Sequence, residues 1–363
     1  MLFTPAKIGP LTLPNRLVRS ATAECMADAD GRPLPRLKEM YQVLARGGVG
    51  LIITGHMYVH PSGKAHPGMT GVYADDLIPD LAELADAAHR EGGRVAVQIN
   101  HGGMQCDPEA TPETIAPSAV DATFLQRPAR EMTPEEIERL IDAYAQAARR
   151  VKEAGFDGVQ IHGAHGYLVG QFLSPFVNRR ADAWGGDLAG RSRFLHAVCQ
   201  AVRGQVGPDY PVFIKLGLID AVEDGLTAEE GVQLVAALEE MGLDAVEISG
   251  GIGGGTDLNT RAGIRSEEDE AYFRPLARRA RPFTRLPIIL VGGFRSRSVM
   301  EKVLAVGEAD FISLCRPLIC EPDLPERLRL GIQERSACLS ANRCWPKHAE
   351  EGVACRCAVE RER

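Results

Sequence analysis

The sequence lacks the long apolar runs, the excess of positive charge and the low-complexity segments that mark several protein classes. No apolar stretch approaches the roughly 20 residues that a membrane-spanning helix needs. The 363 residues include 41 basic and 49 acidic side chains, and the net charge of −8 argues against general nucleic-acid binding. The first residues lack the charged-then-apolar pattern of a signal peptide. We therefore expect a cytoplasmic globular protein that binds neither membranes nor nucleic acid.

Several motifs of nucleotide binding and catalysis are absent too. The chain contains no Gly-x-Ser-x-Gly nucleophile elbow, no His-Glu-x-x-His zinc motif and no Walker A loop. A glycine cluster that begins at Gly250 does not match Gly-x-Gly-x-x-Gly in any register, and it follows a late strand. A separate dinucleotide-binding domain of the Rossmann type is therefore not expected.

Short β-branched runs recur along the chain, and each is followed by a segment with helical periodicity. Continuous apolar runs of this length suit strands of a parallel sheet that is buried on both faces. Eight such units predict a (β/α)8 TIM barrel, and residues 8–15 are expected to form a hairpin that plugs its opposite end. The expected strands are 17–22, 49–54, 95–99, 158–162, 212–216, 245–249, 287–291 and 310–314.

The helix starts, the long loops and the end of the barrel can also be placed. Thr133 and Thr227 each precede acidic residues in the pattern of a capped helix start. Long loops at 100–131 and 163–190 are expected on the C-terminal face, where barrels build their active sites. We expect residues 1–335 to form the barrel domain and residues 336–363 to form a separate Cys-rich tail.

Polar residues follow the ends of the predicted strands. Gly292 and Gly293 follow the seventh strand and Arg316 follows the eighth, which are the places of the recurrent phosphate site of barrels. Glycine lets backbone N–H groups approach a phosphate closely, and an arginine offers a bidentate fork. These residues predict a phosphate site, and the alternative is a tight turn with a surface ion pair.

His162, His165 and Tyr167 follow the fourth strand, and their spacing allows three interpretations. The two histidines could bind a metal, but no nearby carboxylate or third histidine completes a ligand set. They could be structural. They could instead donate hydrogen bonds to one substrate oxygen, and Tyr167 could then protonate an enolate carbon.

The stretch around these residues resembles a known family. It reads Ile161-His162-Gly163-Ala164-His165-Gly166-Tyr167-Leu168 and continues with characteristic pieces at 171–175, 178–180, 184–186 and 191–194. Shorter pieces at 2–5, 14–16, 311–313 and 316–319 occur in the family's order. Over residues 1–335 the chain is similar to the Old Yellow Enzyme family, whose members are FMN-dependent ene-reductases on a TIM barrel.

The resemblance implies a reaction. NADH or NADPH would reduce FMN, and a hydride would then pass from flavin N5 to Cβ of a small α,β-unsaturated carbonyl compound. His162 and His165 would bind the activating oxygen, and Tyr167 would protonate Cα. Two alternatives stay open, namely a flavin-dependent dehydrogenase or desaturase, and an electron-transfer module that docks to a partner through the tail. Assembly into a homo-oligomer is also left open.

The resemblance also implies the cofactor contacts. Thr22 would bond the flavin C4 carbonyl, Gln98 would bond the pyrimidine edge, and the cation of Lys215 would stabilise the reduced flavin. Relatives differ after the third strand, so either Asn100 or His101 could reach the pocket. The full set of implied cofactor contacts is Ala21, Thr22, Gln98, His162, Lys215, Gly292, Gly293, Cys315 and Arg316.

The tail contains four of the nine cysteines, at positions 338, 344, 355 and 357. Its first part resembles the iron–sulfur motif of larger relatives such as 2,4-dienoyl-CoA reductase, but Ala341 occupies the second cysteine position. A [4Fe–4S] cluster normally takes four thiolates. Cys338, Cys344, Cys355 and Cys357 could still supply four, but we expect free thiols and no bound metal.

Overall fold

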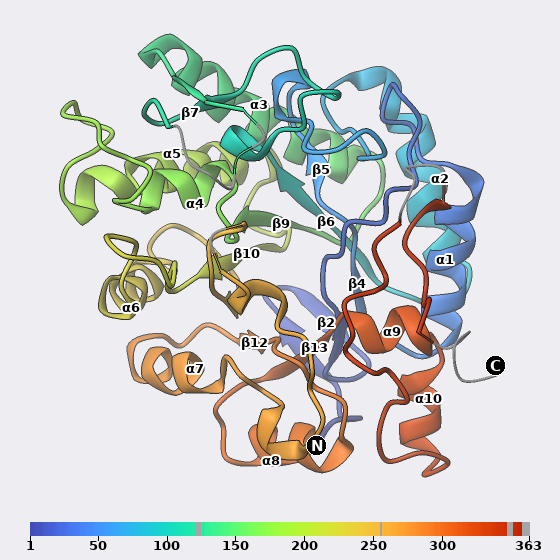
Figure 1. Cartoon of the computed structure of the whole chain (residues 1–363). Coiled ribbons are helices and arrows are strands. Elements are labelled where there is room, and N and C mark those ends of the chain that lie inside the picture. The colour runs from blue at the N-terminus through green and yellow to red at the C-terminus, as the bar shows by residue number, and fades with distance from the viewer. Residues whose placement is uncertain (121–124, 126, 255, 347–350, 358–363) are drawn as a thin grey trace.

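Parallel strands form a closed barrel in the computed structural model, which describes residues 1–120, 125, 127–254, 256–346 and 351–357 (Figure 1). The barrel strands are β3 (Leu17–Arg19), β4 (Leu51–Ile53), β6 (Val95–Asn100), β9 (Gly158–Gly163), β10 (Val212–Gly217), β11 (Val246–Ser249), β12 (Ile288–Leu290) and β13 (Phe311–Leu314). Their order is β4-β3-β13-β12-β11-β10-β9-β6, and pairing of β4 with β6 closes the ring. The expected TIM barrel and its eight strands are confirmed.

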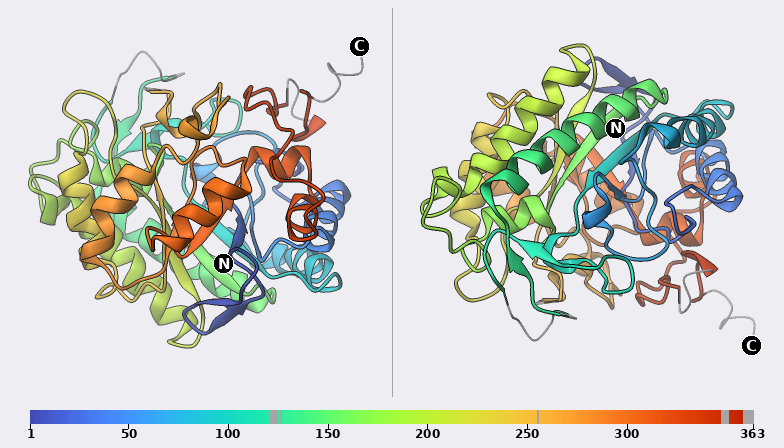
Figure 2. Two further views of the ribbon diagram at one scale, coloured as in Figure 1. Left: turned by 90° about the horizontal axis from the view of Figure 1, so that it is seen from below. Right: turned by 90° about the horizontal axis from the view of Figure 1, so that it is seen from above.

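Helices surround the barrel, as the views in Figures 1 and 2 show. They are α1 (Pro35–Arg46), α2 (Ile78–His89), α3 (Pro134–Glu153), α4 (Leu168–Leu173), α5 (Leu188–Val206), α6 (Ala228–Ala237), α7 (Arg274–Ala280), α8 (Arg297–Ala305), α9 (Arg316–Cys320) and α10 (Leu324–Arg329). Short 3-10 turns lie at Pro61–Gly63, Asp75–Leu77, Gly103–Gln105, Leu258–Thr260, Glu267–Asp269 and Arg281–Phe283. In the part of the chain that the structure describes, no helix has the length and apolar character to cross a membrane.

The predicted caps begin two of these helices. Thr133 at the start of α3 accepts a hydrogen bond from the backbone N–H of Glu136, whose carboxylate accepts one from the N–H of Thr133 in return. Thr227 and Glu230 form the same reciprocal pair at the start of α6. Each pair satisfies two donors that the first turn of a helix leaves without a partner.

An N-terminal hairpin closes the bottom of the barrel. Strands β1 (Ala6–Ile8) and β2 (Leu11–Leu13) pair antiparallel, and Ile8 and Leu13 are fully buried. These two side chains pack in one apolar cluster with inward residues of the barrel strands, including Phe213. The expected hairpin plug is therefore confirmed.

The barrel interior changes from apolar to polar along the strands. Side chains of alternate residues on a strand face the same side, so Phe213 and Lys215 of β10 both point inward, at successive levels. The same alternation places Ala245 below Glu247 at β11. The lower level belongs to the apolar cluster with the hairpin, whereas the upper level consists of buried polar groups. The sequence therefore builds a sealed floor and a polar layer above it.

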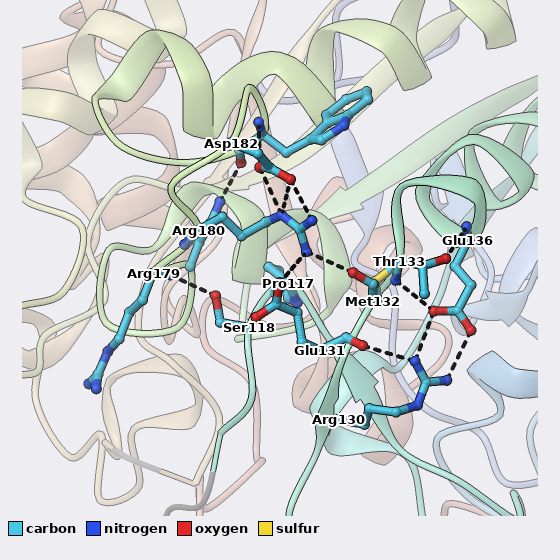
Figure 3. Close-up of polar contacts among 12 residues, drawn as sticks. Pro117, Ser118, Arg130, Glu131, Met132, Thr133, Glu136, Arg179, Arg180 and Asp182 are labelled. Atoms are coloured by element: carbon cyan, nitrogen blue, oxygen red, sulfur yellow. Dashed lines mark hydrogen bonds and ion pairs between the residues drawn. The ribbon is translucent and has the colours of Figure 1, made fainter.

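The two long loops lie at the C-terminal ends of the strands, as expected, and Arg180 joins them (Figure 3). The first loop contains the short parallel pair β7 (Ile115–Ala116) and β8 (Arg130–Glu131), and β5 (Met57–Tyr58) pairs with β6 nearby. Arg180 of the second loop donates hydrogen bonds to the carbonyls of Pro117 and Met132 at 2.7 and 2.8 Å. Its other nitrogens bind the carboxylate of Asp182. One buried guanidinium thus fixes both loops above the barrel.

Replacement of Arg180 by alanine should destabilise the protein. The change removes charge-assisted hydrogen bonds, each of which contributes about 1.5–3 kcal/mol, and leaves two carbonyls without their partner. We expect the free energy of unfolding, measured with urea, to fall by at least about 2 kcal/mol. Arg179→Ala is the matched control, because that side chain stacks on Phe176 and does not join the loops. Equal losses in the two variants would contradict this role.

Candidate active site

A buried ion pair lies in the polar layer of the barrel. The Lys215 ammonium lies 3.0 Å from Oε1 of Glu247, and the Glu247 side chain has no solvent exposure. The same carboxylate accepts hydrogen bonds from Ser20 at 2.7 Å, from Ser313 at 2.9 Å and from Gln160 at 2.9 Å. Residues at or just beyond four other strands therefore converge on one carboxylate of β11.

The charge of Glu247 is stabilised by these neighbours. Burial alone would raise the pKa of this carboxyl, but attraction to Lys215 and the hydrogen bonds from Ser20 and Gln160 hold its pKa below the ordinary value. Lys215 also donates a hydrogen bond to Ser20 at 2.8 Å. The ammonium therefore has a fixed position at the edge of the space above.

A cavity opens above this layer, at the C-terminal face of the barrel. It brings together many of the residues that the sequence predicted for the cofactor, since its lining includes Ala21, Thr22, Lys215, Gly293, Cys315 and Arg316. His165 of the predicted catalytic group also lines it. Further lining residues that were not predicted come from several loops and include Ser249, Thr260, Tyr272, Ser340 and Trp345.

One end of the cavity has the features of an anion site. Gly292 and Gly293 both have positive φ angles, of 138° and 75°. A Cβ on Gly293 would lie 3.1 Å from Ile264 and from Tyr272, so both the backbone angle and the space favour glycine there. The Arg316 guanidinium follows in the chain at the end of β13 and is largely buried. Gly292 itself does not line the cavity.

The predicted catalytic residues form a cluster of rings beside the cavity. The ring centroids of His162 and His165 are 5.3 Å apart, and those of His162 and Tyr167 are 4.9 Å apart. The His165 imidazole shares a hydrogen bond of 2.7 Å with the hydroxyl of Ser249. Nδ1 of His162 is buried and has no hydrogen-bond partner among the described residues. One unpaired ring nitrogen therefore lies within this cluster.

Burial keeps all three of these groups uncharged at neutral pH. Burial lowers the pKa of His162 well below its ordinary value, and it lowers the pKa of His165 to about 3. Burial likewise raises the pKa of the Tyr167 phenol above its ordinary value. The cluster therefore contains a protonated phenol and two neutral imidazoles, so it can donate hydrogen bonds without a fixed charge.

Asn100 and His101 follow one another at the end of β6, and both are fully buried. The Asn100 amide donates a hydrogen bond of 2.8 Å to Nδ1 of His56, and the His56 ring lies 4.9 Å from that of Tyr167. His101 instead bonds Ser62 and the backbone of Gly103. Asn100 therefore lies in the surroundings of the ring cluster, and the choice between the two residues as a ligand contact stays a prediction.

Several predicted cofactor contacts have partners within the protein. Arg316 donates to the side-chain oxygen of Asn342 and to the carbonyl of Ser340. The Thr22 hydroxyl lies 3.1 Å from the sulfur of Cys315 and donates a hydrogen bond to the carbonyl of Ser20. Gln98 does not line the cavity and donates a hydrogen bond of 2.7 Å to Gln160. Their roles toward the flavin stay predictions.

The Cys-rich tail contributes residues to the cavity. Ser340 and Trp345 line the cavity, and the thiols of Cys355 and Cys320 lie 2.7 Å apart. No three His, Cys, Asp or Glu side chains of the described residues form a group that could hold a metal ion. The expectation that the tail binds no metal stays a prediction, as does the domain boundary at residue 335.

Sequence reasoning missed several residues of the site. Glu247 was visible as an acidic residue inside an otherwise apolar predicted strand, which is a signal of a buried partner. His56 follows the second strand and could have been found by its position at a strand end. Trp345 carried no such signal, because its place depends on how the tail folds back.

Comparison with known proteins agrees with the fold. Residues 1–335 match the model of the NADH:flavin oxidoreductase / NADH oxidase family. The chain is 35% identical over 326 residues to an NADPH dehydrogenase of Geobacillus sp. (strain WCH70). This match covers 90% of this chain and 92% of that relative. It is also 37% identical over 363 residues to an NADH oxidase of Thermoanaerobacter brockii. This second match covers 99% of this chain and 55% of that relative. The chain thus spans about half the length of several longer relatives.

A solved structure shows the same architecture. Morphinone reductase in complex with tetrahydroNAD superposes with a TM-score of 0.79 at 28% identity, over 92% of both chains. The family whose model matches is one of FMN-dependent oxidoreductases, as the sequence predicted. The chain belongs to the NADH:flavin oxidoreductase / NADH oxidase family, the family of Old Yellow Enzyme.

The groups around the cavity suit FMN. Arg316 and the glycine at position 293 present a cation and an open backbone for a terminal phosphate. Lys215, held by Glu247, presents a second cation to the same cavity. Two cations in one largely buried cavity match a ligand with a phosphate at one end and a ring that gains negative charge on reduction.

Replacement of Arg316 by alanine should weaken FMN binding about ten- to a hundredfold. A charge-assisted bidentate contact contributes roughly 1.5–3 kcal/mol, which corresponds to that range of affinity. Dissociation constants from flavin fluorescence during titration of the apoprotein measure the effect. Arg285→Ala is the control, because Arg285 is 89% exposed and pairs only with Glu239 among the described residues. A variant that retains FMN through dialysis as well as the parent would refute the role of Arg316.

Replacement of Glu247 by glutamine should destabilise the apoprotein by about 3–5 kcal/mol, because it leaves the buried Lys215 ammonium without its counterion. The folded-state pKa of Glu247 is depressed, so its contribution is present above the unfolded pKa of about 4.3 and is lost as pH falls through the folded pKa. Urea unfolding at several pH values should show that this pH-dependent contribution to the free energy of unfolding is absent from the variant. The double variant Glu247→Gln/Lys215→Met should recover most of the lost free energy of unfolding, because it contains no unpaired buried charge. No recovery would mean that the unpaired Lys215 ammonium does not cause the loss.

Proposed function

We propose that the protein uses NADH or NADPH to reduce the C=C bond of α,β-unsaturated carbonyl compounds. The observation that carries this proposal is the cluster of uncharged His162, His165 and Tyr167 side chains beside a cavity that suits FMN. When bound, FMN accepts a hydride from the nicotinamide and supplies it to the substrate. The relatives named NADH oxidase and NADPH dehydrogenase support the use of a reduced nicotinamide.

The histidines would hold and polarise the carbonyl oxygen of the substrate. Nδ1 of His162 has no hydrogen-bond partner among the described residues, so a ligand oxygen would satisfy it. His165 is oriented by its hydrogen bond to Ser249, which leaves the other ring nitrogen for the ligand. Neutral imidazoles donate to an oxygen as negative charge develops on it, and in a buried site such donors are effective.

Tyr167 would deliver the proton to Cα. A phenol is protonated at neutral pH, and burial raises the pKa of Tyr167 further above its ordinary value. Its ring contacts both His162 and His56, which fix its position without an ion pair. A positioned acid next to the oxygen-binding histidines is what protonation of an enolate requires.

Anaerobic turnover with NADPH and cyclohexenone tests the proposal directly. An ene-reductase consumes NADPH and forms cyclohexanone in equal amounts. A dehydrogenase or desaturase of amine or steroid-like compounds would leave both compounds unchanged. An electron-transfer module would need an added partner before NADPH is oxidised.

Replacement of Tyr167 by phenylalanine should slow the reaction with enones and leave flavin reduction by NADPH almost unchanged. Reduction of the flavin takes no proton from this phenol, whereas general-acid catalysis is typically worth about 10²–10⁴-fold in rate. Stopped-flow measurement of the two half-reactions separates the effects. Tyr73→Phe is the control, since that hydroxyl bonds the carbonyl of Asp30 away from the ring cluster. Equal slowing of both half-reactions would mean that Tyr167 organises the pocket and is not the acid.

A further inference from the structure

The C-terminal segment, which the structure describes at residues 336–346 and 351–357, brings a large aromatic side chain to the mouth of the cavity. Trp345 lines the same cavity as Thr22 and Lys215, although it lies far from both in the sequence. Its side chain is 56% exposed, whereas the side chain of a tryptophan is on average largely buried in a folded protein. An exposed tryptophan at the rim of a ligand cavity provides a flat apolar surface for a ligand.

Hydrogen bonds from separate loops hold this segment in place. The Asn342 amide donates to the carbonyl of Thr260 at 2.6 Å, and Arg316 donates to the carbonyl of Ser340. The backbone N–H of Val353 donates to the carbonyl of Glu24 at 2.8 Å. These contacts reach residues that follow β11, β13 and β3 in the chain.

The backbone of Trp345 has its own support. Nη1 of Arg356 donates to the carbonyls of Cys344 and Trp345 at 2.8 and 3.0 Å, and the same guanidinium pairs with Glu351. The position of the indole therefore does not depend on burial of its ring.

A series of ring contacts connects Trp345 to the proposed acid. The indole lies edge-on to His66 at 5.7 Å, and His66 lies 5.5 Å from His56. His56 in turn contacts Tyr167 at 4.9 Å. Three successive ring contacts thus join Trp345, which lines the cavity, to Tyr167.

We propose that Trp345 is a specificity-determining residue, whose indole packs against the part of an enone that extends beyond the reacting double bond. This inference rests on the proposed function. It assigns flat, aryl-substituted enones as the preferred substrate class over small cyclic ones. An aromatic pair contributes about 0.5–1.5 kcal/mol beyond the area that it buries, which corresponds to roughly two- to twelvefold in affinity.

The test compares benzylideneacetone, which carries a phenyl group, with cyclohexenone, which does not. In Trp345→Ala the KM for benzylideneacetone should rise about three- to tenfold with kcat within twofold, because the lost contact is equal in ground and transition states. The KM for cyclohexenone should change less than twofold. Trp345→Phe should restore most of the affinity, and Trp345→Leu should restore less.

A binding measurement separates this inference from the proposed function. The oxidised FMN-bound protein is titrated with para-hydroxybenzaldehyde and followed by flavin absorbance, and Trp345→Ala should raise the Kd about three- to tenfold. If the parent protein reduces neither enone, the proposed function fails, whereas this Kd still tests Trp345. Leu339→Ala is the matched control, because Leu339 is 40% exposed on the same segment and does not line the cavity.

Three results would overturn the inference. The first is an equal change of KM for both enones in Trp345→Ala. The second is an unchanged Kd for para-hydroxybenzaldehyde. The third is loss of FMN from Trp345→Ala and Trp345→Leu but not from Leu339→Ala, because Trp345 would then serve the cofactor and not the choice of substrate.

Discussion

The buried pair of Lys215 and Glu247 is the interaction on which the site depends. Two charges inside a protein are costly to desolvate, and they persist only where good geometry and further hydrogen bonds compensate. Glu247 meets that condition, because Ser20, Ser313 and Gln160 also donate to it. The barrel strands must therefore close in this register, and closure fixes an ammonium at the edge of the cofactor cavity.

The rest of the site is arranged around that fixed cation. Below it, an apolar layer with the N-terminal hairpin seals the barrel. Beside it lie the neutral rings of His162, His165 and Tyr167, which are the proposed donors of hydrogen bonds and of the proton. Trp345 of the C-terminal segment lines the cavity above it, and Arg180 joins the two long loops at the same end of the barrel. The apolar layer thus closes the barrel, and the polar layer holds the Lys215 ammonium in place.

Much of this arrangement could be predicted from the sequence because it follows the order of the strands. The end of each strand can be located from the residues around it, so Lys215, Arg316 and Tyr167 could be assigned to one face of the barrel. Contacts across the barrel could not be predicted in this way. The hydrogen bond between Ser20 and Glu247, for example, forms only when the barrel closes and joins residues 227 positions apart. Trp345 and the choice between Asn100 and His101 depend on side-chain direction and on the folding of the tail, which no periodicity encodes.

In the proposed reaction, a hydride that originates from NADPH reaches Cβ of an enone while a proton from the protein reaches Cα. Anaerobic reduction of cyclohexenone by NADPH in D₂O tests this reaction, because the proton that Tyr167 donates comes from a hydroxyl that exchanges with solvent. Analysis of the product by NMR at early times should show one deuterium at Cα. A product without deuterium at Cα, or no reduction of the double bond, would contradict the proposed reaction.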